Sequence, residues 1–378
     1  MSLAIKHVDA IPVTIGHVPE FTDSGIARGA GMGEGIGYVV VRVVCDDGIV
    51  GYGECGRYFE NETQDSALLN IRRFLAPSLL TMDVLNPVAC RRAMDFALKG
   101  NTYAKMAVET AIWDACGKAL DVSVSTLLGG RLRDHVAVSC TLSIQLPPAA
   151  AAEEARKRVS EGYRCVRLKI GNDERRELEG VAHIREAVGD EVGLRVDANQ
   201  GYNRAQAVRI LRRMEAFDLL LIEQPLDKAD VIGMREVAAA LDTPVVADEG
   251  AISPRAVFDI ARLEAADGIQ VKTGRAGGLT NARLMMEMAR AAGLVVGVGG
   301  MLELGIGAAT NIHLAATAVE LSSPMEFDLP RVLVDDIVCD PLRIEDGRVR
   351  VPTGPGLGIQ VDSDKLDHYR NRDLDGRA

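Results

Sequence analysis

The chain has 378 residues, of which 47% are hydrophobic and 26% are charged, so it can bury a core too large for one small domain. Its formal net charge of −11 excludes a polyanionic partner such as DNA or RNA, because nucleic-acid binding requires a basic face. These values predict a well-packed globular protein with two domains, or with one barrel and an appendage.

The first residues predict neither a secretory signal nor a membrane anchor. The segment MSLAIKHVDAIPVTIG alternates in polarity like a β-strand and lacks the basic and apolar regions of a signal peptide. No uninterrupted apolar run reaches membrane-spanning length, and the seven cysteines are scattered without a CxxC pair, which favours free thiols. We therefore expect a cytoplasmic protein that does not bind a membrane.

Residues 1–125 predict an α+β domain. Two strand patterns surround a DDG turn in VVVRVVCDDGIVGYGE, and helical patterns follow around residues 64–78, 86–98 and 103–120. This domain precedes a longer region with a different, repetitive pattern.

Residues 126–340 contain eight short apolar runs that alternate with helical patterns, which is typical of βα units and a parallel sheet. The runs are VAVSCTLSI (136–144), CVRLKIG (165–171), VGLRVDANQ (192–200), LLLIEQP (219–225), PVVADEG (244–250), DGIQVKTG (267–274), LVVGVGG (294–300) and MEFDLP (325–330). Eight such units predict a (β/α)8 barrel. The eighth run is the weakest, and a doubly wound open sheet is the alternative. The tail, 341–378, has the pattern of one more hairpin on an EDG turn, and we expect it to return to the first domain.

Five consecutive runs each end in one charged side chain: Lys169, Asp197, Glu223, Asp248 and Lys272. In a (β/α)8 barrel this end of the strands forms the mouth, where catalytic groups collect. Three adjacent carboxylates need a counter-charge, because like charges at close range push one another toward protonation. Oxygen-only ligands favour Mg2+, with Mn2+ as the alternative. The alternative is that each carboxylate caps the N-terminus of a separate helix, but this role does not explain why three carboxylates lie in register on consecutive strands.

The two lysines belong to the second and sixth strands, so the three carboxylate strands lie between them and the amines face one another across the mouth. An amine stripped of water near other cations has a lowered pKa and can act as a base near neutral pH. Two such amines can remove and return a proton on opposite faces of a substrate. Salt bridges to barrel acids are the alternative role, and they suit a single lysine better than this pair.

Ordered motifs across nearly the whole chain resemble the enolase superfamily, and within it the muconate-lactonizing enzyme subgroup of the mandelate racemase and muconate lactonizing enzyme family. The motifs are RLKIG, RVDANQGY, LIEQP, ADEG, QVKTGRAGGLT and GGMLELGIG, with IWDACGKALDVSVSTLLGGRLRD before the barrel and VPTGPGLGIQVDSDKLDHYR after it. The resemblance implies a modified TIM barrel with an N-terminal α+β capping domain that the C-terminal segment completes. It also implies Mg2+ on Asp197, Glu223 and Asp248, acid/base roles for Lys169 and Lys272, a small carboxylate substrate, and a homo-oligomer between dimer and octamer.

The same resemblance extends to residues around this set. It implies that Asn199, Glu249 and Glu303 support the metal, the far lysine or the substrate's charge. The glycines of RGAGMGEGIG (28–37) precede a strand instead of following one and opening a helix, so we expect no dinucleotide site there. The resemblance implies that the segments at about 20–37 and 51–60 are lid loops over the barrel mouth. They contain three candidate specificity contacts, for which ordinary packing is the alternative: Phe21, Met32 and Tyr58.

Four more polar residues are candidates for substrate contacts. Arg275 either bridges to a carboxylate or contacts the substrate. Glu326 and Asp328 stand at i and i+2 and resemble the acidic pair with which dipeptide epimerases hold a substrate ammonium group, and a solvent-facing pair is the alternative. Arg167 replaces a lysine that many relatives carry two residues before the base, and we expect it to help bind the substrate carboxylate.

The family's shared step is metal-assisted removal of the proton α to a carboxylate, which gives an enediolate. GRAGGLT, GGMLELGIG and the acidic pair favour a racemase or epimerase of an N-substituted amino acid or dipeptide. The C-terminal PTGPGLGIQVDSDKLDHYR favours a muconate-type cycloisomerase instead. A dehydratase or synthase that eliminates a β-leaving group, and a non-catalytic barrel that keeps the metal site, are the remaining alternatives.

Overall fold

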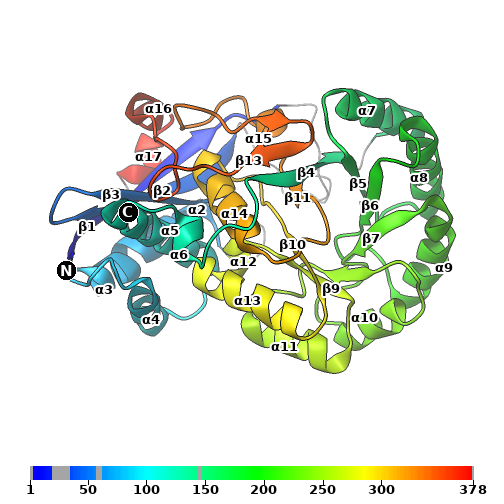
Figure 1. Cartoon of the computed structure of the whole chain (residues 1–378), viewed down its shortest axis with the longest axis horizontal. Coiled ribbons are helices and arrows are strands. Elements are labelled where there is room, and N and C mark those ends of the chain that lie inside the picture. Colours follow the sequence, from blue (N-terminus) through cyan, green and yellow to red (C-terminus); the bar gives the residue numbers. More distant parts are fainter. Residues whose placement is uncertain (1–2, 19–34, 57–61, 143–145, 377–378) are drawn as a thin grey trace.

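The computed structural model describes residues 3–18, 35–56, 62–142 and 146–376, and places a capping domain beside a barrel (Figure 1). The capping domain begins with an antiparallel sheet of β1 (Ile5–Ile15), β2 (Ile36–Cys45) and β3 (Val50–Gly56), in that order. Helical segments follow: α2 (Gln64–Asn70), the π-helix η1 (Ile71–Leu75), α3 (Ala76–Leu79), α4 (Pro87–Ala97), α5 (Thr102–Leu120) and α6 (Val124–Leu127).

Both faces of this small sheet are buried. Along β2, Tyr38 and Val40 belong to a core shared with the barrel, whereas Val39, Val41 and Val43 belong to the core formed with the capping helices. Successive side chains of a strand point to opposite faces, so a strand buried on both sides needs no alternation of polarity. The VVVRVV run therefore places the sheet between the helices and the barrel.

The barrel consists of parallel strands in sequence order, with the connecting helices outside them (Figure 1). Its strands are β4 (His135–Leu142), β5 (Cys165–Lys169), β6 (Gly193–Asp197), β7 (Leu219–Glu223), β8 (Val245–Ala247), β9 (Gly268–Val271), β10 (Val295–Val298) and β11 (Met325–Glu326). Strand β11 pairs in parallel with β4, which returns the sheet to its first strand. The predicted (β/α)8 barrel is confirmed, and the doubly wound sheet is wrong because the strand order never reverses.

The barrel helices begin where local capping residues predict. Asp173 caps α8, Ser253 caps α11 ahead of a proline, and Asn203 forms a capping box with Gln206 at the start of α9. The helical segments are α7 (Pro148–Ser160), α8 (Glu174–Val188), α9 (Arg204–Met214), η2 (Glu215–Phe217), α10 (Val231–Ala238), α11 (Pro254–Leu263), α12 (Thr273–Ala276), α13 (Leu279–Ala291) and α14 (Gly305–Thr317). In the described part of the chain, no helix is both long and apolar enough to cross a bilayer.

The eighth strand is shorter than the predicted run 325–330, since only Met325 and Glu326 are extended. Helix α15 (Leu329–Val332) begins after Phe327 and Asp328, with a proline in its first turn, where the missing N–H costs no hydrogen bond. Just before β11, Ser322 joins the strand to β10: its hydroxyl accepts from Val296 N, and its N–H donates to Val296 O, both at 2.9 Å.

The C-terminal segment contacts both parts of the molecule. Its hairpin, β12 (Ile344–Glu345) and β13 (Arg348–Arg350), pairs antiparallel with β4 of the barrel. The helices α16 (Ser363–His368) and α17 (Arg372–Asp375) then lie against the capping sheet (Figure 1), where Thr14 N donates to Tyr369 O and Asn371 N donates to Pro12 O.

Two buried carboxylates of the capping domain reach the N-termini of barrel helices. Glu109, on α5, accepts from Thr280 N in the first turn of α13 at 2.9 Å and pairs with Arg91 at 2.8 Å. Glu54, on β3, accepts from Leu304 N at the start of α14 at 2.6 Å. Carboxylates stabilise helix N-termini, because unpaired N–H groups and the positive end of the dipole lie there. The capping domain is therefore fixed to the two helices that follow β9 and β10.

Candidate active site

The charged residues at the strand ends converge on one edge of the barrel. Lys169 lies in register with Asp197 on the neighbouring strand, and Asp197 with Glu223 on the next. Asp248 and Lys272 follow the last residues of β8 and β9 directly. All five side chains are buried, and the three carboxylates are fully so. Parallel strands thus bring together groups that stand far apart in the chain.

The two lysines lie on opposite sides of this edge, because β5 and β9 are four steps apart in a ring of eight strands. Lys169 Nζ donates to Asp197 Oδ2 at 2.6 Å and to Asn199 Oδ1 at 2.7 Å. Lys272 Nζ donates to Asp248 Oδ2 at 2.9 Å. Burial and the nearby Arg167 lower the pKa of Lys169. Burial has the same effect on Lys272, but Asp248 and Glu326 outweigh it and raise that pKa.

Glu223 differs from the other carboxylates because neither of its oxygens has a hydrogen-bond partner among the described residues. The nearest cations are Arg167 and Arg195, each 3.7 Å from one oxygen. Burial, followed by the charges of Asp197, Glu326 and Asp248, raises its pKa to about 8. A buried carboxyl group without hydrogen bonds is costly, and at 3.7 Å the two arginines offset its charge without donating to it.

The donor set suits a hard divalent cation, although the side chains do not form a closed group of ligands. In the part of the chain that the structure describes, no three His, Cys, Asp or Glu side chains are arranged to hold a metal. Asp197 and Asp248 instead contact the lysines, and Asp248 also pairs with Arg275. The oxygens available are all carboxylate, as Mg2+ prefers, and those of Glu223 are without partners. Asp197, Glu223 and Asp248 thus supply the type of donor that suits Mg2+, while Lys169, Lys272 and Arg275 occupy oxygens of the two aspartates.

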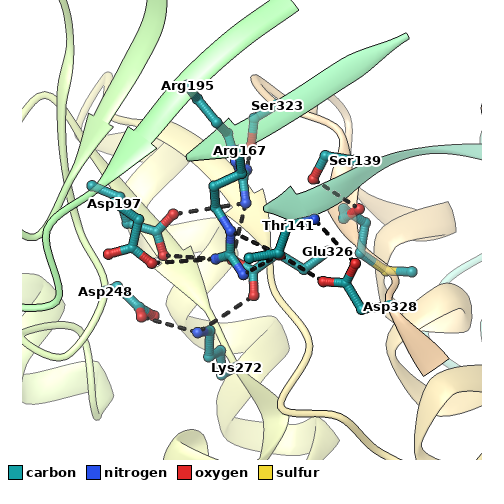
Figure 2. Close-up of polar contacts among 12 residues, drawn as sticks. Ser139, Thr141, Arg167, Arg195, Asp197, Asp248, Lys272, Ser323, Glu326 and Asp328 are labelled. Carbon is teal, nitrogen blue, oxygen red and sulfur yellow. Dashed lines mark hydrogen bonds and ion pairs between the residues drawn. The ribbon is translucent and has the colours of Figure 1, made fainter. Parts of the chain in front are cut away.

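Arg167 lies among these carboxylates, with Asp197 on one side and Thr141 on the other (Figure 2). Its Nη1 is 3.3 Å from Asp197 Oδ2 and forms a short ion pair with Glu326. Its Nε and Nη2 donate to the hydroxyl of Thr141 at 3.2 and 2.7 Å. Burial disfavours this charge, but Glu326, Glu223 and Asp197 together raise the pKa of Arg167. The structure therefore gives every donor group of the guanidinium a protein partner.

Glu326 contacts three cations of the site. Besides Arg167, it accepts from Arg195 Nη2 at 2.9 Å and lies 3.6 Å from Lys272 Nζ. Burial opposes ionisation, but these three cations lower its pKa to about 2. Arg195 is fully buried and also donates to Ser323 (Figure 2). We did not identify Arg195 from the sequence, although it precedes Asp197 by two residues as Arg167 precedes Lys169.

Asp328 does not share these partners. Its carboxylate accepts from the N–H of Thr141 at 3.0 Å and from its hydroxyl at 2.6 Å, and it pairs with Arg331 at 2.9 Å. Glu326 and Asp328 are both buried, so neither faces solvent. The two carboxylates therefore have separate partners and do not act as one acidic pair.

The supporting residues expected from the sequence lie around this centre. Asn199 connects Lys169 to Glu249, to which its amide donates at 3.0 Å. Burial and Asp248 raise the pKa of Glu249. Glu303 follows β10 and accepts from Met301 N at 2.7 Å and from Asn311 at 3.0 Å. Three candidates from the predicted lid loops, Phe21, Met32 and Tyr58, lie outside the described residues.

A second buried acidic cluster lies beside Glu303, and the sequence did not indicate it. Glu54 and Asp336 accept from the first two N–H groups at the start of α14, those of Leu304 and Gly305. Each keeps one buried oxygen without a hydrogen-bond partner among the described residues. Burial raises the pKa values of Glu54, Asp336 and Glu303. These residues come from three separate parts of the chain, so spacing could not reveal them.

A capped (β/α)8 barrel with buried carboxylates and lysines at the C-terminal ends of its strands has the architecture of an enzyme. Residues 26–129 match the family model for the mandelate racemase/muconate lactonizing enzyme N-terminal domain. Residues 150–365 match the model for the enolase C-terminal domain-like fold. The chain belongs to the mandelate racemase and muconate lactonizing enzyme family of the enolase superfamily and is an isomerase.

Three relatives show the range of this similarity. Muconate cycloisomerase 1-2 of Acinetobacter lwoffii is 35% identical over 339 residues, which cover 88% of each chain. L-Ala-D/L-Glu epimerase of Bacillus subtilis is 33% identical over 326 residues, which cover 85% of this chain and 88% of the relative. The crystal structure of N-succinyl Arg/Lys racemase from Bacillus cereus superposes with a TM-score of 0.91 at 29% identity, covering 97% of this chain and 98% of that one. Relatives with different reactions are thus almost equally similar.

Proposed function

We propose that the protein removes the proton α to a substrate carboxylate and returns a proton to the same carbon. The observation that carries this proposal is the pair of buried lysines, Lys169 and Lys272, on opposite sides of the barrel mouth. An amine on each face allows one residue to take the proton and the other to supply its replacement.

Asp197, Glu223 and Asp248 would hold Mg2+, or Mn2+ in its place. Bound there, the metal would stabilise the negative charge that develops on the substrate carboxylate. The chain's own contribution is to exclude water from the lysines and to supply Asn199 and Glu249 as supports for Lys169. A low-dielectric site strengthens these interactions, because water no longer screens them.

We infer that the substrate is an N-acylamino acid and not a dipeptide with a free ammonium group. An ammonium would need an available carboxylate, and both candidates already have protein cations. Glu326 pairs with two arginines, and Asp328 pairs with Arg331. The racemase relative from Bacillus cereus, named for N-succinyl Arg/Lys, supports an acylated nitrogen.

A muconate-type cycloisomerase is the second candidate. It is favoured by the muconate cycloisomerase relative, which is as similar over its length as the racemase and epimerase. That reaction needs one proton transfer at the α-carbon, so only one of the lysines would be required for it.

Exchange of the substrate α-proton in D2O tests both candidates. With Mg2+ present, we expect deuterium at the α-carbon of both enantiomers of an N-acylamino acid. Lys169→Ala should abolish exchange for one enantiomer and Lys272→Ala for the other, because each lysine serves one face. The control is Lys105→Ala, which removes a buried lysine of the capping domain paired with Asp95.

The outcomes separate the reactions. Exchange of muconolactone alone would favour the cycloisomerase. Absence of exchange with N-acylamino acids, dipeptides and muconolactone, or unchanged exchange in both lysine variants, would refute proton transfer by this pair.

A further inference from the structure

We propose that Arg167 is a counter-cation for Asp197 and Glu223. Its positive charge offsets theirs in the metal-free enzyme and weakens the binding of Mg2+. This inference rests on the proposed function, because it takes those two residues as metal ligands. It assigns Arg167 to the expected metal ligands, whereas the sequence predicts a contact with the substrate carboxylate.

The contacts of Arg167 carry the inference. Its Nη1, which pairs with Glu326, also lies 3.3 Å from Asp197 Oδ2 and 3.7 Å from Glu223 Oε1, so one nitrogen is close to both expected ligands. Of the other cations around Asp197, Glu223 and Asp248, Lys169 contacts Asp197, while Lys272 and Arg275 contact Asp248. Arg195 approaches Glu223 at 3.7 Å. Arg167 alone in this set lies between two of the expected ligands.

The other contacts of Arg167 hold its guanidinium in place. Nε and Nη2 both donate to Thr141, whose hydroxyl donates in turn to Asp328 at 2.6 Å. Glu326 forms a short ion pair with Nη1 (Figure 2). A planar guanidinium can satisfy these partners together, and it keeps its proton at any pH that the fold survives. A lysine has a single nitrogen and would leave some of them unpaired.

The electrostatic consequence follows from the burial of the site. Arg167 and Asp197 are both shielded from solvent, so their attraction is poorly screened. A metal entering between Asp197 and Glu223 would meet this fixed positive charge.

Calorimetric titration of Mg2+ into the metal-free protein tests the inference, with electron paramagnetic resonance of Mn2+ as a second readout. Arg167→Met should bind Mg2+ at least about tenfold more tightly than the wild type, because one nearby positive charge is removed. Arg167→Lys should stay within about threefold of the wild type, because the charge remains. The matched control, Arg185→Met, removes a buried arginine whose partners are backbone carbonyls, and it should leave affinity unchanged.

The outcomes are distinguishable. If the wild type binds Mg2+ and Arg167→Met binds it equally or more weakly, the counter-cation role is wrong while the metal site stands. If neither the wild type nor any variant binds Mg2+ or Mn2+, the metal assignment itself fails. If Arg167→Met does not fold, crystal structures of the wild type with and without Mg2+ test the proposal instead. We expect Nη1 to leave Asp197 and Glu223 when the metal is present, and an unmoved guanidinium would overturn the proposal.

Discussion

At the scale of single residues, Glu223 shows how a site can be assembled at the expense of stability. Its carboxyl group is fully buried and has no hydrogen-bond partner among the described residues, while Asp197 and Asp248 lie nearby. Such a group is costly to bury, which natural sequences usually avoid unless the position serves binding. The sequence predicted its place at a strand end, since that depends only on the run LLLIEQP.

Glu223→Gln tests this cost. In metal-free protein, the change should raise the free energy of unfolding by about 1–3 kcal/mol, because a buried carboxyl group without hydrogen-bond partners is replaced by a neutral amide. It should also abolish the increase in melting temperature that Mg2+ produces in the wild type. Thermal denaturation with EDTA and with excess Mg2+ measures both effects. Glu264→Gln, at an exposed position on the same barrel, is the control. A destabilised Glu223→Gln protein that still responds to Mg2+ would contradict the assignment.

At the scale of elements, helix α14 depends on residues from three parts of the chain. Glu54 of β3 and Asp336 of the C-terminal segment accept from its first N–H groups, and Tyr38 donates to Leu302 O just before it at 2.7 Å. Cβ atoms on Gly305 and Gly307 would lie 2.8 Å from oxygens of Asp336 and Glu54, so the two glycines leave room for the carboxylates. The loop carrying Glu303 is therefore positioned by the capping domain.

This cluster predicts a pH dependence of stability. Burial raises the pKa values of Glu54, Glu303 and Asp336, so the folded protein holds protons that the unfolded chain has released. The groups facing them include Tyr38, Asn311, Lys272 and Lys365, as the causes of the pKa shifts and the hydrogen bonds show. Stability should fall as the pH rises above the ordinary carboxyl pKa of about 4, because the unfolded state binds fewer protons there.

The double variant Glu54→Gln/Asp336→Asn removes two of the titrating groups. Its free energy of unfolding should therefore decline less with rising pH than that of the wild type. Urea denaturation at a series of pH values gives both curves. Parallel curves would show that the cluster does not titrate between the folded and unfolded states.

Local sequence patterns predicted some features of the fold and the site and missed others. Elements and strand-end charges follow from local patterns, as with Asp197 at the end of VGLRVDANQ. Contacts across the barrel do not follow from local patterns, because Arg167 and Glu326 meet only after the strands close into a ring. The length of the eighth strand was overestimated for a related reason: Asp328 turns to Thr141, a contact with a distant strand.

At the scale of the whole molecule, Glu109 holds the capping domain against the barrel. It is fully buried and accepts from Arg91, Trp113 and Thr280. Glu109→Ala should lower the free energy of unfolding by about 3–5 kcal/mol, because Arg91 would remain buried without this carboxylate. Glu179→Ala, which breaks an exposed pair with Arg175, should change it by less than about 1 kcal/mol. Equal effects in chemical denaturation would show that Glu109 does not link the two parts.

Backbone pairing is incomplete at the junction between the seventh and eighth strands, β10 and β11. Ser322 ties β11 to β10 at the base of the barrel, whereas the described ladder pairs β11 only with β4. At the mouth, the segment with Glu326 and Asp328 is held to the rest of the ring by side chains and by its pairing with β4. It can therefore shift away from β10 without breaking a strand-to-strand bond. We therefore expect the backbone amides of β11 and of the residues facing it on β10 to exchange with solvent before those of β5, β6 and β7.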